Sequence, residues 1–180
     1  TEQGEALFTH FGLSGPLVLS ASTYIEDIAK HDYVCEFDLK PALDEKTLYD
    51  RLTRDFAAQG SASAQGALAK LLPNSMRPVA VEKWSVDPAT KAAQITREQK
   101  QALVQLCKHW QVPVTALGDK EHAVVTAGGV DVKEVAPKTM ASKLCSGLYF
   151  AGEVLDVDAR TGGYNLQIAW STAQAAVRAM

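Results

Sequence analysis

The sequence predicts an α+β fold in which a helix-rich segment interrupts a β-rich one and a strand–loop–helix unit follows. Three observations predict it. Residues 33–40 alternate apolar and polar side chains, which is the period of a half-buried strand. Residues 44–110 carry apolar side chains at helical spacing together with capping signals. From residue 112 onward the period returns toward two, as expected for further strands.

The N-terminal segment begins with a short apolar run that ends in a glycine and serine turn. Ser14 is a candidate N-cap, and Pro16 suits a first helical turn because it lacks an N–H that would be unpaired there. Apolar residues at helical spacing then predict a helix over residues 17–28. The strand at 33–40 follows and should end at Pro41.

Residues 41–111 are predicted to form a separable helical subdomain. Asp44 is a candidate N-cap for its first helix. The apolar face of that helix would consist of Leu48, Leu52 and Phe56. Thr96 and Gln99 have the spacing of a capping box at the start of the last helix.

Strand signals dominate the remainder of the chain until its last helix. Residues 114–117 and 123–126 are expected to be strands, and the glycine pair that follows them marks a turn. Residues 148–151 form a compact apolar run that is typical of a buried strand, and residues 166–180 are predicted to be a helix.

Composition narrows the class of protein. The 180 residues include 18 Lys and Arg and 21 Asp and Glu, for a net charge of -3, and 47% are hydrophobic, which is typical of a globular protein. The slightly acidic balance and the dispersed basic residues argue against partners such as nucleic acid or a membrane surface. The chain starts without Met or a signal-peptide pattern and ends inside a predicted helix. We therefore expect a piece of a longer, cytoplasmic protein.

The stretch around residues 147–165 is the strongest candidate for a binding site. A buried strand runs into Gly152 and Glu153, and the paired glycines Gly162 and Gly163 precede the last helix. Ligands bind at such strand ends in α/β sheets, and paired glycines let a ligand approach backbone N–H groups. The positive end of the helix dipole would favour negative charge there. The alternative is an ordinary tight turn that begins a helix.

Other chemistry-bearing residues give weaker signals. His10 is the one candidate acid or base, because it sits beside a glycine turn and has a pKa near neutrality. The histidines lack the spacing of a metal site, and the carboxylates Glu153, Asp156 and Asp158 are better explained as a solvated loop, so no metal is expected. No GxSxG motif is present, which argues against serine hydrolase chemistry.

Four segments in order along the chain resemble signatures of one known family. They are GEALFTHFGLSGP at residues 4–16, VTAGGV at 125–130, TMASK at 139–143, and GLYFAGEVLD with TGGYNLQ between 147 and 167. Together they resemble the HI0933-like flavoproteins, also called the BaiN or aminoacetone-oxidase-like family of FAD-dependent oxidoreductases. The segments span nearly the whole chain, which makes their combination specific.

The resemblance implies a layout and a cofactor site. Residues 1–40 and 112–145 would form a β-barrel insert, residues 41–111 its helical subdomain, and residues 146–180 a strand–loop–helix that belongs to a Rossmann-like FAD domain. Contacts with FAD are implied near the ribityl and phosphate groups and near the flavin ring. The residues implied are Gly152 and Glu153 for the former and Thr161, Gly162, Gly163, Tyr164 and Asn165 for the latter.

The resemblance also implies an activity. The whole protein would be an FAD-dependent oxidoreductase, linked to NAD(P)H, in which the insert shapes the substrate side of the flavin. The dinucleotide motif GxGxxG is absent from this chain. We therefore expect the chain alone to be inactive and not to retain FAD, with the N-terminal FAD-binding half as its partner and an unknown small molecule as substrate. The alternative is a binding module of a flavin-containing protein that carries out no turnover.

Overall fold

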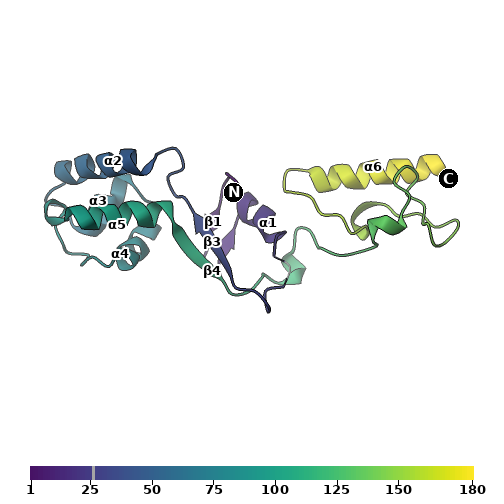
Figure 1. Ribbon diagram of the computed structural model, residues 1–180, viewed down its shortest axis with the longest axis horizontal. Helices are drawn as coiled ribbons and strands as arrows, with labels where there is room; N and C mark the ends of the chain where they lie inside the picture. Colours follow the sequence, from purple (N-terminus) through teal and green to yellow (C-terminus); the bar gives the residue numbers. More distant parts are fainter. Residues whose placement is uncertain (26) are drawn as a thin grey trace. The chain divides into compact units, whose positions relative to one another are not determined.

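The computed structural model describes residues 1–25 and 27–180, apart from the side chain of His122, and it divides into two compact units (Figure 1). One unit combines residues 1–33 with residues 115–180, and the other consists of residues 34–114. We call them the split unit and the helical unit, and each is described by itself.

The helical unit contains four α-helices joined by short turns. They are α2 (Glu45–Ala58), α3 (Ala64–Ala67), α4 (Arg77–Trp84) and α5 (Arg97–Lys108), with 3-10 turns η1 (Leu68–Lys70), η2 (Asn74–Met76) and η3 (Ala92–Gln94). Both caps predicted for this unit are confirmed, whereas the prediction of Ser14 as an N-cap is wrong, because Gly15 precedes the helix that begins at Pro16 and no side chain caps it. The Asp44 carboxylate accepts the N–H of Thr47 at 2.7 Å, and Thr96 and Gln99 form the reciprocal bonds of a capping box.

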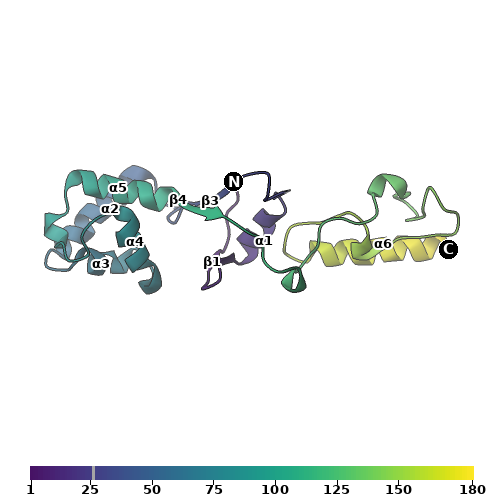
Figure 2. The same ribbon diagram turned by 90° about the horizontal axis from the view of Figure 1, so that it is seen from below.

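The apolar faces of α2 and α5 make the core of this unit, and the two helices lie side by side in both views (Figures 1 and 2). Phe56 is 1% exposed, and Leu103 and Cys107 are fully buried. Trp84 joins them and donates its ring N–H to the carbonyl oxygen of Gln99 at 2.7 Å. Burial raises the pKa of the Cys107 thiol to about 11, so this side chain packs as a neutral group.

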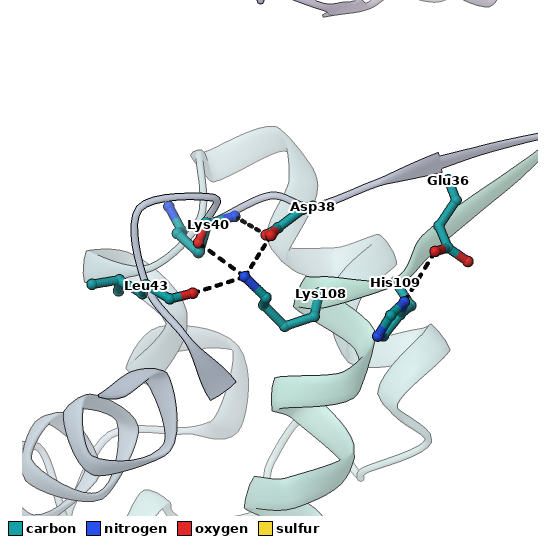
Figure 3. A network of polar contacts seen from close by, with 6 residues as sticks. All are labelled: Glu36, Asp38, Lys40, Leu43, Lys108 and His109. Atoms are coloured by element: carbon teal, nitrogen blue, oxygen red, sulfur yellow. Dashed lines mark hydrogen bonds and ion pairs between the residues drawn. The ribbon is translucent and has the colours of Figure 1, made fainter. Parts of the chain in front are cut away.

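Strands β3 (Tyr33–Phe37) and β4 (Trp110–Val114) pair with each other as a small antiparallel sheet. Lys108 fixes the turn between β3 and α2 (Figure 3). Its ammonium group donates to the carbonyl oxygen of Leu43 at 2.7 Å, to that of Lys40 at 3.3 Å and to the carboxylate of Asp38. This lysine side chain is only 14% exposed, so little water can reach its ammonium group. The three acceptor oxygens take the place of that water.

The split unit has little regular structure. Its helices are α1 (Pro16–Ser22) and α6 (Tyr164–Ala179), and its strands β1 (Leu7–Phe8) and β2 (Leu13–Ser14) form an antiparallel pair. Short 3-10 turns occur at η4 (Lys120–His122), η5 (Val132–Glu134) and η6 (Gly152–Val154). Its buried hydrophobic core is small and consists of Val135, Met140, Leu155 and Ala176.

The expected β-barrel is not closed in the described part of the chain. A barrel requires every strand to pair along both edges, whereas the strands here form two separate two-stranded sheets. The strands expected at 114–117 and 123–126 do not form, and Val124 in the second of these is 68% exposed. The run at 148–151 contributes one isolated antiparallel bridge, between Ala141 and Tyr149.

The helix expected over 17–28 ends early, at Ser22. Ser22 and Thr23 donate their hydroxyls to the carbonyl oxygens of Leu19 and Ser20, at 2.7 and 2.9 Å. Such local side-chain bonds compete with continuation of the helix. Glu26, inside the expected range, lies outside the described residues. Among the helices that the structure describes, none combines the length and the apolar character that a bilayer crossing requires.

We expect the helical unit to lose much of its stability when its core is truncated. Leu103→Ala removes a fully buried side chain between α2 and α5 and should cost about 2–5 kcal/mol in the free energy of unfolding. Urea unfolding followed by the fluorescence of buried Trp84 measures this change. Val79→Ala is the matched control because Val79 is 44% exposed, and equal losses for the two variants would contradict the assigned core.

The stability of the helical unit should depend on pH through Glu36. The Glu36 carboxylate accepts a hydrogen bond from Gln111 at 2.8 Å and one from His109 at 3.0 Å, the second of which is drawn in Figure 3. These bonds lower the pKa of Glu36 from its ordinary value of 4.5. A carboxyl whose pKa is lowered by folding stabilises the fold above its unfolded pKa. This contribution is lost as the pH falls through the folded value.

Urea midpoints between about pH 6 and pH 3 should therefore fall less steeply for Glu36→Gln than for the unmodified chain. Asp50→Asn, a change at an exposed carboxylate of α2, serves as the control. Its plot of urea midpoint against pH should match that of the unmodified chain. A Glu36→Gln profile that matches the unmodified one would show that these hydrogen bonds do not persist in solution.

Candidate functional site

The sequence segments that resemble the known family lie together in the split unit. The first three of them bond to the fourth, at residues 147–167. The VTAGGV segment bonds the final loop, because Val130 donates its N–H to Val154 and accepts that of Asp156, both at 2.9 Å. The TMASK segment bonds the preceding run. There, Phe150 donates to the carbonyl oxygen of Met140 at 2.9 Å, and Ser142 donates to Leu148 at 2.8 Å.

Two carboxylates fasten the VTAGGV segment to the final loop. Glu153 accepts the backbone N–H of Thr126 at 3.2 Å, and Asp156 accepts that of Gly128 at 3.1 Å. Glu153, a predicted cofactor contact, therefore has one oxygen engaged within the chain. Asp156 was interpreted as part of a solvated loop. The sequence signal for its role was the glycine pair, whose unpaired N–H groups need acceptors.

Gly129 makes the closest approach in this region. Its φ of +145° lies in a region that L side chains rarely adopt, and a Cβ built on it would lie 2.5 Å from the carbonyl oxygen of Val154. No side chain fits there without moving the backbone. The neighbouring Gly128 has φ +98° but open space around its Cβ position. Glycine is thus required at 128 for conformation alone and at 129 for conformation and contact.

The first turn of α6 presents backbone donors. Gly163 precedes it with φ +88°, and no side chain caps the helix. The first N–H groups of a helix have no partner within it, so those of Tyr164, Asn165 and Leu166 are available to a ligand. A Cβ on Gly163 would meet no atom within 4 Å, which shows that the space in front of this helix end is open.

Asn165 holds the loop in front of α6 in place. Its side-chain oxygen accepts the N–H of Ala159 at 2.8 Å, and its amide donates to the carbonyl oxygen of the same residue at 2.9 Å. These bonds engage one donor and one acceptor position of the Asn165 side chain, and the backbone N–H of this predicted cofactor contact has no partner within the helix. The paired bonds explain why an asparagine follows the glycines, since an amide can both donate and accept.

Thr161 joins this loop to the first motif of the chain. Its hydroxyl lies 3.1 Å from that of Ser20 and also donates to the carbonyl oxygen of Pro16 at 3.3 Å. Ser20 is 6% exposed and was not predicted as a site residue. Its position four residues after Pro16 on the same helix face was the available signal.

Gly152 lies farther along α6. Its N–H donates to the hydroxyl of Thr172 at 2.9 Å, and a Cβ on it would lie 3.7 Å from Ala169. Eight residues of helix separate Tyr164 from Thr172, which is about 12 Å. The two groups of predicted FAD contacts are therefore placed at two points along a single helix, residues 161–165 at its start and Gly152 beside Thr172.

An open pocket of about 580 Å³ adjoins the start of α6, with Tyr24, Arg160 and Tyr164 in its lining. Arg160 lies 2.8 Å from the carboxylate of Glu2 and donates to the hydroxyl of Tyr24 at 3.2 Å. The hydrogen bond with Tyr24 and the charge of Glu2 raise the pKa of Arg160, so the guanidinium remains charged. The pocket lining thus combines two tyrosine rings with Arg160, whose charge is paired with Glu2, and with the carboxylate of Asp158.

His10 lies apart from these residues. It stands in the turn between β1 and β2, is exposed, and contacts the ring of Phe11 edge-to-face with the centroids 5.1 Å apart. It forms no hydrogen bond with residues 152–165 within the described part of the chain. No group of three or more potential metal ligands occurs among the residues that the structure describes.

Comparison with known protein families shows to which family this chain belongs. The family described as "HI0933-like protein barrel and H2TH domain" matches residues 1–125. The chain belongs to the HI0933-like family. This confirms the resemblance inferred from the four sequence segments.

Curated relatives of this HI0933-like chain include two ribosomal RNA dihydrouridine synthases, each 36% identical to it. The protein of Haemophilus influenzae aligns over 171 residues, 95% of this chain and 41% of the relative. That of Escherichia coli aligns over 169 residues, 94% of this chain and 40% of the relative. The 3-dehydro-bile acid delta(4,6)-reductase of Clostridium scindens is 29% identical over 180 residues, 99% of this chain and 44% of the relative. The chain thus spans about two-fifths of the length of these relatives.

We expect Gly129→Ala to open the contact between the VTAGGV segment and the final loop. Gly128→Ala is the matched control, because it incurs a comparable backbone strain of about 1–2 kcal/mol without the 2.5 Å contact. Hydrogen exchange at the amides of Val130 and Asp156 should accelerate strongly in the first variant and much less in the second. Equal exchange in the two variants would contradict the close approach.

Proposed function

We propose that this chain is part of an FAD-dependent reductase that adds hydrogen across a C=C bond conjugated to a carbonyl, with the uracil ring of ribosomal RNA as substrate. The observation that carries the proposal is that the three other sequence segments all bond to residues 147–167, the segment that contains the loop and the uncapped helix end. This arrangement of the segments forms in the present chain although the dinucleotide motif GxGxxG is absent from it.

The names of the relatives favour this reaction class. Uridine has a ring C=C bond that is conjugated to a carbonyl group. Dihydrouridine is the product in which two hydrogens have been added across that bond. A delta(4,6)-reductase of a 3-dehydro-bile acid likewise reduces double bonds, which are conjugated to the 3-oxo group. Each double bond that is reduced takes one hydride and one proton. A bound flavin supplies such a hydride, with NAD(P)H as the reductant that we expect.

The residues at the start of α6 fit the flavin ring. Gly163 leaves open space before a helix whose first N–H groups are unpaired, and a helix N-terminus stabilises negative charge of the kind that a reduced flavin carries. Tyr164, 62% exposed, is available to contact the ring. Gly152 and Glu153 would then lie nearer the ribityl and phosphate groups. The Tyr24 and Arg160 pocket adjoins the ring position and suits the substrate side.

The split unit needs a partner to bury its apolar surface. Of the large apolar side chains that are exposed among the described residues, only Val34 and Val79 lie in the helical unit. On α6, Leu166, Trp170 and Val177 are 59–67% exposed and recur at intervals that place them on one helix face. We propose that this face packs against the FAD-binding half of the longer protein.

The proposed packing of α6 against the FAD-binding half suggests a layout for the longer protein. Residues 146–180 would complete a Rossmann-like FAD domain, residues 1–40 and 112–145 would contribute to a barrel that further chain closes, and residues 41–111 would extend from it. The protein would work in the cytoplasm, where ribosomal RNA is modified. This substrate departs from the expectation based on net charge, because the charge is divided unevenly between the two units.

The full-length protein tests the proposal. It should purify with FAD and, with NAD(P)H, convert uridine in unmodified ribosomal RNA to dihydrouridine, detected by mass spectrometry of digested nucleosides. The chain of residues 1–180 should retain no flavin after desalting. A full-length protein that holds FAD but is not reduced by NAD(P)H would favour the rival hypothesis of a binding module without turnover.

Gly163→Ala tests the cofactor contact separately. A methyl group in the space before α6 should weaken FAD binding by about tenfold, roughly 1.4 kcal/mol. Gly147→Ala is the matched control, since Gly147 also has positive φ and open space but is not one of the predicted FAD contacts at 152–153 and 161–165. Flavin titrations of the two full-length variants compare them. Equal affinities would place the flavin elsewhere.

A further inference from the structure

The charge of the chain is divided unevenly between its two units. The helical unit carries eleven Lys and Arg against nine Asp and Glu, whereas the split unit carries seven against twelve. The overall charge of -3 therefore hides a positive excess in one unit. A polyanion would be attracted to the helical unit and repelled by the other, so the location of the excess charge decides how such a partner would bind.

Four basic side chains surround one corner of the helical unit, where η1 leads into η2. Arg51 of α2 donates from its guanidinium to the carbonyl oxygen of Lys70 at 2.7 Å. Arg77 of α4 donates to the carbonyl oxygen of Leu72 at 3.2 Å. These two acceptors are two residues apart, so the guanidiniums converge from different helices on one turn. Arg54 is exposed one turn along α2 from Arg51. We call Arg51, Arg54, Lys70 and Arg77 the basic corner.

Few carboxylates offset this charge. Asp55 lies 3.5 Å from Arg51, and Asp50 is exposed on the same helix. The basic corner thus holds four positive charges against two negative ones, which accounts for the whole positive excess of the unit. Exposed Asn74 and Ser75 in the following turn add hydrogen-bond donors of the kind that contact phosphate oxygens.

The two arginines are held in place before any partner arrives. A guanidinium has five N–H donors in a fixed plane, so a bond to one carbonyl oxygen leaves others free to bind a phosphate. Because the carbonyl bonds already order these side chains, less conformational entropy is lost on binding than for a free lysine or arginine. Exposed Lys70 and Arg54 supply mobile charge beside them.

We propose that the basic corner binds the phosphate backbone of the RNA substrate, at a place in the chain separate from the reaction site. The inference rests on the proposed function, which supplies RNA as the partner. Phosphate contacts position a nucleic acid without reading its sequence. The corner therefore contributes affinity and salt dependence, and the pocket in the split unit is left to select the base.

Charge reversal in the full-length protein tests this. The double variant Arg54→Glu, Lys70→Glu leaves untouched the two arginines that bind carbonyl oxygens. Lys91→Glu, Arg97→Glu, at exposed positions elsewhere in the helical unit, changes the net charge equally and is the matched control. The probe is a fluorescein-labelled single-stranded oligouridine, titrated by anisotropy at several salt concentrations. Thermal melting verifies that each variant folds.

The corner variant should bind the probe at least about tenfold more weakly than the control variant. We also expect a smaller salt dependence. The slope of the logarithm of the binding constant against the logarithm of the salt concentration should be shallower than that of the control variant by about 1.4, because two phosphate contacts are lost. Equal losses in the two variants, or no binding by the unmodified protein at low salt, would overturn the inference. FAD retention and uridine reduction are scored separately. Binding through the corner without reduction would refute the proposed reaction alone, and reduction with unchanged binding would refute the corner alone.

Discussion

The contact between Gly129 and the backbone of Val154 is the constraint on which the split unit depends. This unit buries few apolar side chains, so the hydrophobic effect alone gives it little stability. Its parts are joined instead by backbone hydrogen bonds that flank this contact, from Val130 to Val154 and from Asp156 to Val130. Those bonds form only because residue 129 has no side chain. The loop that presents the candidate flavin site is anchored by the same contact, so site geometry and fold share one cause.

The helical unit is stabilised differently. Its helices bury whole apolar faces against one another, and its one nearly buried lysine, Lys108, finds three oxygen acceptors. A unit of this kind can keep its fold while its surface changes. Its surface is thus the part of the chain where charge can be placed for binding without cost to the core. The split unit has no such freedom, since its exposed apolar surface has to match a partner.

Local features of the fold could be predicted, and distant ones could not. The Asp44 cap and the Thr96 capping box depend on residues three apart, so spacing alone identifies them. The barrel that the family resemblance implies is not closed in the described part of the chain, and two of its expected strands do not form, because alternation over four residues does not show whether a partner strand exists. Lys108 bonds the Leu43 carbonyl across 65 residues, and no spacing rule reports such a pair. In the candidate site, the glycines were visible as turn residues, whereas the partners of Asp156 and Asn165 were not.

Under the proposed function, the two units would divide the work of binding an RNA substrate. A reductase has to bring one ring against its cofactor while it holds a long polyanion, and these tasks require opposite surfaces. The candidate ring site presents tyrosine rings and backbone N–H donors in the split unit. Phosphate binding requires clustered basic side chains, which the helical unit carries at the basic corner. Separation of the two tasks on units with opposite net charge satisfies both requirements, and it orients the polyanion because only one unit attracts it.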